Sequence, residues 1–288
     1  GRRMKRAILL GHPVAHSLSP VFQQAAFDHE HLPVRYELSD VAPGSLATAI
    51  AALRADTDVI GANVTIPHKE SIATLLDAVD DEATAVGAVN TIVRAGTRLI
   101  GRNTDVTGFR SALELLVDGR QPPRDVLLLG AGGGARAVLA VLATSGAVRI
   151  AISNRHLHRG EKLARAVSAA APHLTLRPVP WHEGLLADEA TRAGLIINAT
   201  SLGLTGESPL PAAAFHPGQL VIDLAYGPEA TPLVRAARAA GAEAIDGREM
   251  LIGQGAAAFN LWTGRSAPIA VMRAALEGAL LNRTGGRA

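Results

Sequence analysis

One stretch constrains the fold of this chain more than any other: residues 126–142, with the sequence VLLLGAGGGARAVLAVL. Four apolar residues of strand character lead into a glycine-rich turn, and an apolar segment of helical character follows. Gly130, Gly132 and Ala135 fit the spacing G-x-G-x-x-G/A, which allows a tight turn, a close approach to a pyrophosphate and close helix packing. The phosphates of such a ligand lie at the helix N-terminus. The sequence therefore predicts a dinucleotide-binding unit here rather than a purely structural turn.

The residues after the next expected strand indicate which dinucleotide binds. NAD-binding proteins place an acidic side chain there, which bonds the ribose 2′-hydroxyl. This chain instead has Asn154 and Arg155, with Arg159 one helical turn further on. A guanidinium group binds phosphate oxygens in a planar, two-pronged manner. The pattern favours NADP over NAD, the alternative being that both arginines are ordinary surface charges.

Segments of strand and helix character alternate along the rest of the chain, which is typical of an α/β fold with a mostly parallel sheet. We expect an N-terminal α/β substrate domain and a Rossmann-like NADP-binding domain. Two helical segments, 247–264 and 267–283, close the chain without a strand after them, and we expect them to return to the first domain. The predicted boundaries are 1–106 with 247–288 for the substrate domain and 107–246 for the NADP-binding domain.

Local patterns in the first hundred residues give more specific expectations. Strands are predicted at 6–11, 34–39 and 58–64, and two short strands within 88–103. Ser19 followed by Pro20 predicts a helix start with Ser19 as its N-cap. The segment 71–79, SIATLLDAV, has helical character, so a second helix is expected there.

Composition excludes several classes of protein and site. The chain has 288 residues, 48% of them hydrophobic and 19% charged, which is enough to bury two cores. It has no cysteine, which excludes disulfides, thiolate nucleophiles and Cys-based zinc sites. Its net charge is only +2, and no apolar run approaches the roughly 20 residues of a membrane span, so we expect neither nucleic-acid nor membrane binding. No secretory signal pattern is visible, and a cytoplasmic enzyme is expected. The histidines lack the ligand spacing of a metal site, and we predict no metal.

Polar side chains follow the expected strand 58–64, in the sequence NVTIPHKE. Asn63 and Thr65 are alternate residues of an extended stretch, so both point to one side, and Lys69 comes shortly after. Asn90 and Asp105 follow other strands of the same domain. Open α/β sheets bind ligands at the carboxyl ends of their strands. A Lys and an Asp beside a nicotinamide can move an alcohol proton while hydride moves to the ring. The alternatives are a solvated lysine and an asparagine that only caps the turn.

At these residues the chain resembles the shikimate dehydrogenases, and the resemblance extends over nearly its whole length. It rests on nine motifs that occur in the family's order: GHPVAHSLSP (11–20), NVTIPHK (63–69), GAVNT (87–91), NTD (103–105), GAGGGAR (130–136), NR (154–155), NATSLG (198–203), DLAYGP (223–228) and GQGAAAFNLWTG (253–264). The resemblance implies reversible NADP-dependent reduction of 3-dehydroshikimate to shikimate, a step of aromatic amino acid biosynthesis.

The resemblance also implies a role for each matching residue. Lys69 would be the acid/base and Asp105 its partner. Ser17 and Ser19 would bind the substrate carboxylate, and Tyr226 would reach the substrate from the far side of a cleft. The ring hydroxyls would be held by Asn63, Thr65, Asn90 and Gln254. The cofactor would be held by Gly130, Ala131, Gly132, Gly133, Gly134 and Ala135 at the pyrophosphate, by Asn154, Arg155 and Arg159 at the ribose phosphate, by Leu224 and Gly247 at the nicotinamide, and by Asp81.

Some alternatives remain open from the sequence. His156 stands where the family often has Thr, which removes one hydroxyl contact at the ribose and bears on cofactor discrimination. A quinate or aminoshikimate dehydrogenase that uses NAD would share the motifs. A non-catalytic dinucleotide sensor would share the fold, because a fold alone does not imply function. The expected partner is a small-molecule substrate, and the expected state is a monomer or homodimer.

Overall fold

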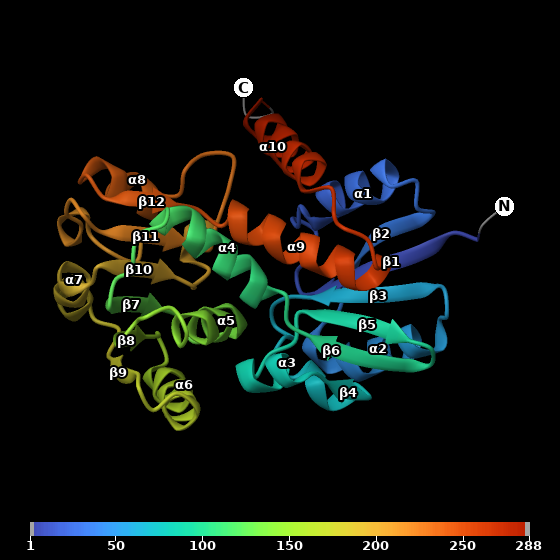
Figure 1. The fold of residues 1–288 in the computed structure, drawn as a ribbon, viewed down its shortest axis with the longest axis horizontal. Helices are drawn as coiled ribbons and strands as arrows, with labels where there is room; N and C mark the ends of the chain where they lie inside the picture. The colour runs from blue at the N-terminus through green and yellow to red at the C-terminus, as the bar shows by residue number, and fades with distance from the viewer. Residues whose placement is uncertain (1–2, 286–288) are drawn as a thin grey trace. The chain divides into compact units, whose positions relative to one another are not determined.

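The computed structural model describes residues 3–285. The chain divides into two compact units, the first made of Gly1–Gly108 with Leu251–Ala288 and the second of Phe109–Met250. The boundaries between the units fall within two long helices, α4 (Asp105–Val117) and α9 (Arg248–Thr263). Each unit contains one six-stranded sheet with helices packed on it, so the predicted α/β fold is confirmed (Figure 1).

The sheet of the first unit is mixed, with the strand order β2-β1-β3-β5-β6-β4. Pairing is parallel for β1 with β2 and β3 and for β4 with β6, whereas β5 runs antiparallel to both of its neighbours. Its elements are β1 (Lys5–Gly11), α1 (Ser19–His29), β2 (Val34–Asp40), α2 (Leu46–Ala55), β3 (Val59–Val64), β4 (Ala78–Val79), α3 (Asp81–Val86), β5 (Thr91–Ala95), β6 (Arg98–Arg102) and α10 (Ile269–Gly285), with 3₁₀ turns at Pro43–Ser45 and Ile72–Leu75.

Both faces of this sheet are covered by apolar side chains. On one face, Ile50 and Leu53 of α2 join Val64 and Ile92 of the strands in a buried cluster. Helix α10 and the part of α9 from Leu251 onward belong to the same unit: α10 packs on α1, and the ring centroids of Phe259 (α9) and Phe27 (α1) lie 5.2 Å apart. Phe259 is therefore a packing residue of this unit.

The sheet of the second unit is wholly parallel, with the order β12-β11-β10-β7-β8-β9. Chain order reverses between β7 and β10, which is the point where doubly wound sheets bind their ligands. The elements are β7 (Asp125–Leu129), α5 (Gly133–Leu142), β8 (Arg149–Ser153), α6 (Leu157–Ala170), β9 (Thr175–Val179), α7 (Glu183–Arg192), β10 (Leu195–Asn198), β11 (Leu220–Asp223), α8 (Pro232–Ala239) and β12 (Glu243–Ile245), with 3₁₀ turns at Leu202–Thr205 and Ala212–Ala214.

The central strands of this sheet are apolar throughout because both faces are buried. Leu127 and Ile196 pack against α7 and α8, through Leu186 and Leu233 among others. On the opposite face, α6 approaches Ile152 at Gly160, where an added Cβ would lie 3.9 Å from Ile152. The uninterrupted VLLL run before the glycine turn therefore belongs to a central strand with helices on both sides.

Two local predictions were wrong. Residues 71–79 form one 3₁₀ turn and then strand β4, because Ala78 and Val79 pair with β6 and Asp77 accepts a bond from Leu99 N (2.7 Å). Ser19 is the first residue of α1 rather than its cap, and Leu18 is the N-cap without a side-chain bond. Strand β9 was not predicted from the sequence. It contains Pro178 and lies at the sheet edge, where a missing N–H is tolerated.

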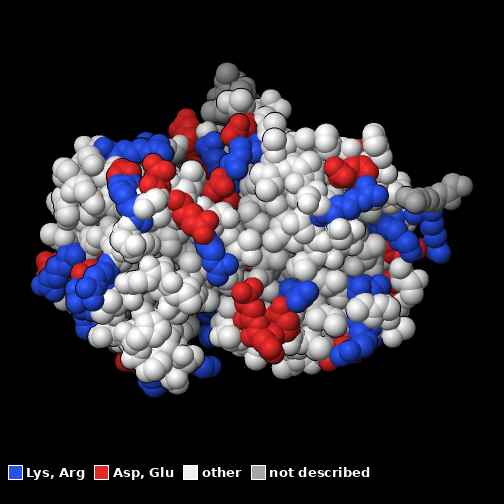
Figure 2. Space-filling model, viewed as in Figure 1, with Lys and Arg blue, Asp and Glu red and all other residues white. Residues whose placement is uncertain are grey.

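Charged side chains are distributed in small groups of both signs over the face drawn in Figure 2. Among the described residues, no helix is long and apolar enough to span a bilayer. Residues 3–285 also contain no group of three or more His, Asp or Glu side chains placed to hold a metal ion.

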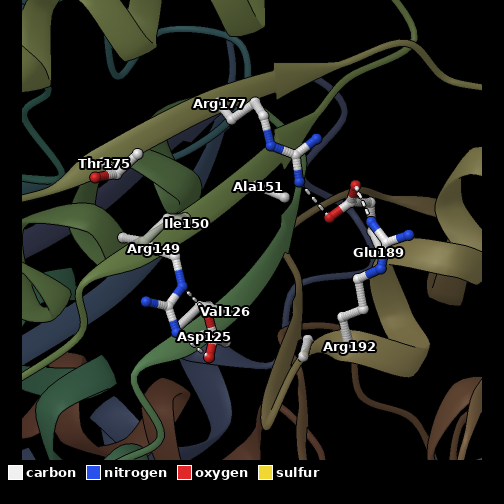
Figure 3. Close-up of a pocket in the computed structure, with 10 residues that line it drawn as sticks. Asp125, Val126, Arg149, Ile150, Ala151, Thr175, Arg177, Glu189 and Arg192 are labelled. Atoms are coloured by element: carbon white, nitrogen blue, oxygen red, sulfur yellow. Dashed lines mark hydrogen bonds and ion pairs between the residues drawn. The ribbon is translucent and has the colours of Figure 1, made fainter.

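A pocket of about 200 Å³ lies at the amino ends of β7, β8 and β9 (Figure 3). Its arginines are paired with acids of the same pocket: Arg149 with Asp125, and both Arg177 and Arg192 with Glu189. The pocket is therefore at the opposite end of the strands from the glycine turn and holds none of the predicted site residues.

Candidate active site

Lys69 and Asp105 are brought together in the first unit. Lys69 Nζ lies 2.6 Å from Asp105 Oδ2, and both side chains are largely buried, at 17% and 6% exposure. Lys69 follows β3 in an irregular turn, and Asp105 is the first residue of α4. The turn is fixed by His68, which is buried and lies 2.6 Å from Val41 O through Nε2, and by a bond from Val89 N to Lys69 O (2.8 Å).

Asn90 holds the other side of the Asp105 carboxylate. It precedes strand β5 rather than following a strand, so its predicted place was wrong, because the segment before it is helix α3. Its Nδ2 donates to Asp105 Oδ1 (3.1 Å) and to Thr104 Oγ1 (2.8 Å), and its Oδ1 accepts from Thr104 N (2.6 Å). Asn103 Oδ1 accepts from Val106 N in the first turn of α4 (3.2 Å). The carboxylate is thus bonded on one oxygen to an ammonium and on the other to an amide, which fixes its orientation.

A chain of buried hydrogen bonds connects Asn90 to Asn63. Asn63 Nδ2 donates to Asn90 O (3.3 Å) and to Thr91 Oγ1 (3.1 Å), and Thr91 Oγ1 donates to Asn90 Oδ1 (3.0 Å). Asn63 also accepts a bond from the Tyr36 hydroxyl (2.8 Å). Lys69, Asp105, Asn90 and Asn63 therefore form one connected polar cluster, which their spacing in the sequence could only suggest.

The other predicted substrate residues of this unit lie on three segments. Thr65 directly follows β3, and its backbone N–H donates to Leu10 O (2.9 Å). Ser17 Oγ accepts from Ser19 N at the start of α1 (3.2 Å). Gln254 lies on α9, and its Nε2 donates to Leu251 O of the same helix (2.8 Å).

Sequence reasoning missed several polar residues that support this cluster. Tyr36, Thr91 and Thr104 are buried members of the hydrogen-bond chain. Gln23 is also fully buried, and its Nε2 donates to Gly255 O (2.9 Å), next to Gln254. No spacing rule separates them from ordinary sheet residues. The only signal was polar character at Tyr36 inside one expected strand, and at Thr91 and Thr104 at the two ends of the expected pair of short strands.

The glycine turn in the second unit has the form expected for a dinucleotide. Gly130 has φ +108°, and an added Cβ there would lie 2.8 Å from Ala199 O, which follows β10. Gly132 is the N-cap of α5, and its missing Cβ leaves open space beside the first helical turn. An added Cβ at Gly134 would lie 3.3 Å from Leu224. Backbone N–H groups at the start of α5 are therefore accessible to a pyrophosphate, and these residues fit the cofactor.

The predicted ribose-phosphate residues follow β8, beside the glycine turn in the parallel sheet. Gly130 N donates to Ser153 O (2.8 Å), which ties the two turns together. Asn154 Nδ2 donates to His156 O (3.0 Å), and Arg155 is exposed. Arg159 lies in the first turn of α6. An exposed arginine at a strand end can reach a phosphate without first leaving a buried partner.

The residues predicted for the nicotinamide end also meet within this unit. Gly247 N donates to Ala225 O (3.0 Å), and an added Cβ at Gly247 would collide with the Leu224 carbonyl group. Tyr226 follows two residues after Leu224 in the same loop. Asp81, by contrast, is an exposed residue in the first turn of α3, in the first unit.

Asp223, directly before Leu224, is a buried acid that the sequence analysis did not assign. Its Oδ1 accepts from Asn198 Nδ2 and from Ala225 N, both at 3.0 Å, while its Oδ2 is buried without a hydrogen-bond partner. Burial raises the pKa of Asp223 above the ordinary value for Asp, and its hydrogen bonds offset only part of that effect. The nearby Asp246 raises the pKa further.

Comparison with known proteins decides which family has this arrangement. The shikimate dehydrogenase substrate binding domain matches residues 9–92, the shikimate 5'-dehydrogenase C-terminal domain matches 247–277, and the saccharopine dehydrogenase NADP binding domain matches 126–261. The shikimate dehydrogenase (NADP(+)) of Moorella thermoacetica is 46% identical over 286 residues, covering 97% of this chain and 95% of its own. The chain belongs to the shikimate dehydrogenase family.

Solved structures agree with this assignment. Shikimate 5-dehydrogenase from Thermus thermophilus, in complex with NADP(H) and shikimate, matches with a TM-score of 0.84 and 37% identity, covering 96% of this chain and all of that one (100%). Quinate dehydrogenase from Corynebacterium glutamicum, in complex with NAD, matches with a TM-score of 0.86 and 29% identity, covering 96% and 99%. The predicted family, fold and enzyme class, an NADP-dependent oxidoreductase acting on a CH–OH group, are confirmed.

Proposed function

We propose that this shikimate dehydrogenase catalyses the reversible NADPH-dependent reduction of 3-dehydroshikimate to shikimate, with Lys69 as general acid/base and Asp105 as its partner. The observation that carries the proposal is the 2.6 Å contact between Lys69 Nζ and Asp105 Oδ2, within one buried polar cluster that contains Asn90 and Asn63. General acid–base catalysis requires a proton-transferring group at a fixed position, and this cluster holds one.

In the direction of reduction, Lys69 Nζ donates a proton to the oxygen of the substrate carbonyl as that oxygen becomes a hydroxyl. In the reverse direction the same amine accepts the hydroxyl proton. Asp105 holds the amine in place and offsets its charge, while Asn90 keeps the carboxylate from rotating. The bound cofactor supplies or accepts the hydride.

Substrate recognition follows from the polar residues around this pair. We assign the substrate carboxylate to the hydroxyls of Ser17, whose Oγ accepts from Ser19 N, and of Ser19, which is the first residue of α1. The ring hydroxyls are assigned to Asn63, Thr65, Asn90 and Gln254, and a further contact to Tyr226. We therefore assign substrate binding to the residues 1–106 with 247–288, apart from the contact of Tyr226.

Most of the cofactor binding is assigned to the residues 107–246, with Gly247 directly after them. The turn Gly130–Ala135 and the start of α5 hold the pyrophosphate, since backbone N–H groups and a helix N-terminus favour anions. Asn154, Arg155 and Arg159 hold the ribose 2′-phosphate, and Leu224 and Gly247 lie along the nicotinamide. Asp81 is a cofactor-side position by family resemblance only.

The test is the absorbance of reduced nicotinamide with purified protein, measured for shikimate and quinate, each with NADP and with NAD. Turnover mainly with shikimate and NADP supports the proposal. Turnover mainly with quinate and NAD would assign the chain to the activity named for the Corynebacterium glutamicum relative, and would contradict the role of Arg155. Tight NADPH binding without turnover of either substrate, or of aminoshikimate, would favour a non-catalytic sensor.

A further inference from the structure

Tyr36 reaches the candidate substrate site from a strand that is not adjacent to it. It lies on β2, whereas Asn63 lies on β3, and β1 runs between them. The register pairs Tyr36 with Ala7 and Ala7 with Gly61, so these three positions share one face of the sheet. Asn63 lies two residues after Gly61 and points to the same face.

Small residues make this reach possible. Ala7 is fully buried and has only a methyl group, and Gly61 has no side chain, so the tyrosine ring can extend over β1. Trp262 of α9 occupies the space that a Cβ of Gly61 would fill, and its ring centroid lies 6.2 Å from that of Tyr36. Trp262 Nε1 donates to Ile92 O (3.0 Å), which fixes the indole. Ala7 therefore lies beneath the Tyr36 ring, and Trp262 packs beside it.

The hydroxyl of Tyr36 determines the orientation of the Asn63 amide. It donates to Asn63 Oδ1 at 2.8 Å, and this bond is buried. Burial raises the pKa of Tyr36, while a hydrogen bond with Ser19 acts in the opposite direction, so the phenol stays neutral and keeps its proton. With Oδ1 fixed by a donor, Asn63 must point its Nδ2 toward Asn90 O and Thr91 Oγ1. A second lone pair of Oδ1 is then left to accept from a substrate hydroxyl.

We infer that Tyr36 is a positioning residue for the substrate, which acts through Asn63 by fixing its amide so that Oδ1 is presented as an acceptor. The inference rests on the proposed role of Asn63 in binding a ring hydroxyl. A rotated amide would present a donor instead of an acceptor and would set Asn63 Oδ1 against Asn90 O, acceptor against acceptor, which costs free energy.

The test begins with Tyr36→Phe, which removes the hydroxyl and retains the ring beside Trp262. We expect the KM for shikimate to rise about tenfold, which corresponds to roughly 1.4 kcal/mol and lies within the range for one buried hydrogen bond. The kcat and the KM for NADP should change little, since the lost interaction serves substrate binding. Thr263→Val removes a bonded hydroxyl from the same unit and serves as a control that should leave all constants unchanged.

A double-mutant cycle with Asn63→Ala decides whether Tyr36 acts through Asn63. We expect Tyr36→Phe to have no further effect on the KM when Asn63 is already Ala. An undiminished effect in that background would overturn the inference while leaving the role of Asn63 intact. An unchanged KM in Asn63→Ala itself would overturn that role and, with it, the inference. Equal rises in the KM for shikimate and in the KM for NADP, together with a lowered Tm, would mark a purely structural tyrosine and would also overturn the inference.

Discussion

Asp105 is bonded on both oxygens, to Lys69 Nζ at 2.6 Å and to Asn90 Nδ2 at 3.1 Å. The two partners come from different parts of the sheet, since Lys69 follows β3 and Asn90 precedes β5. β3 and β5 are neighbours, and their pairing brings the two segments together. The Asp105 carboxylate therefore connects Lys69, the proposed proton donor, to Asn90, whose amide orients the carboxylate.

Replacing Lys69 with Ala should reduce turnover far more than substrate binding. A positioned acid/base contributes about 10² to 10⁴ in rate, so we expect kcat to fall by a factor in that range. The KM for shikimate should change by only about a few-fold, because the amine acts mainly in the transition state. Steady-state kinetics with shikimate and NADP measure both. Lys5→Ala, which removes an amine paired with Asp58 in the same unit, is the matched control and should be near normal.

Replacing Asp105 with Asn should impair the enzyme in a different way. The amide oxygen can still accept from Asn90, but the amide nitrogen then faces the Lys69 ammonium, donor against donor. We expect kcat to fall about 10- to 100-fold, because an acid/base that loses its orientation is a weaker catalyst. Asp58→Asn is the control, and equal losses in both variants would contradict a special role for Asp105.

The fold was predictable from the sequence where local pattern and tertiary structure agree. The VLLL run, the glycine turn and the apolar helix after it became β7, the turn and α5, since each residue there has a single compatible environment. The prediction failed at 71–79, where pairing of β4 with β6 overrides the helical pattern. Tyr36 and Asp223 could not be assigned, because their partners Asn63 and Asn198 are distant in sequence and only the strand order brings them together.

The choice between NADP and NAD should depend on Arg155 and Arg159. Changing both to Ala should raise the KM for NADP by about 10- to 100-fold, since each charge-assisted bond contributes roughly 1.5–3 kcal/mol before screening at an exposed site. The KM for NAD should stay nearly constant, because NAD has no 2′-phosphate. Arg165→Ala on the same helix is the control. Parallel increases for both cofactors would show that the two arginines support the fold rather than recognise the phosphate.

The buried Asp223 should make stability depend on pH with an unusual sign. Its folded pKa is raised above the unfolded value of 3.8, so the folded state binds its proton more tightly than the unfolded state does. The free energy of unfolding therefore falls as pH rises from the unfolded pKa through the folded one. Asp223→Asn keeps an oxygen for Ala225 N and Asn198 Nδ2 and cannot ionise. We expect the variant to be more stable than the parent above this range and to lose that advantage at lower pH.

Urea unfolding at a series of pH values measures the difference in stability between Asp223→Asn and the parent. Asp125→Asn is the control, and its effect on stability should have the opposite sign. The Arg149 guanidinium lowers the pKa of Asp125, so its ionised form is favoured in the folded state. That contribution is present above the unfolded pKa of 3.8 and is lost as pH falls through the folded value. Asp125→Asn should therefore be less stable than the parent at neutral pH, and the free energies of unfolding of the two proteins should become equal at acid pH. If Asp223→Asn followed the same course as Asp125→Asn, the folded state would have to favour the ionised form of Asp223. That result would contradict the prediction, which rests on a buried Oδ2 without a hydrogen-bond partner.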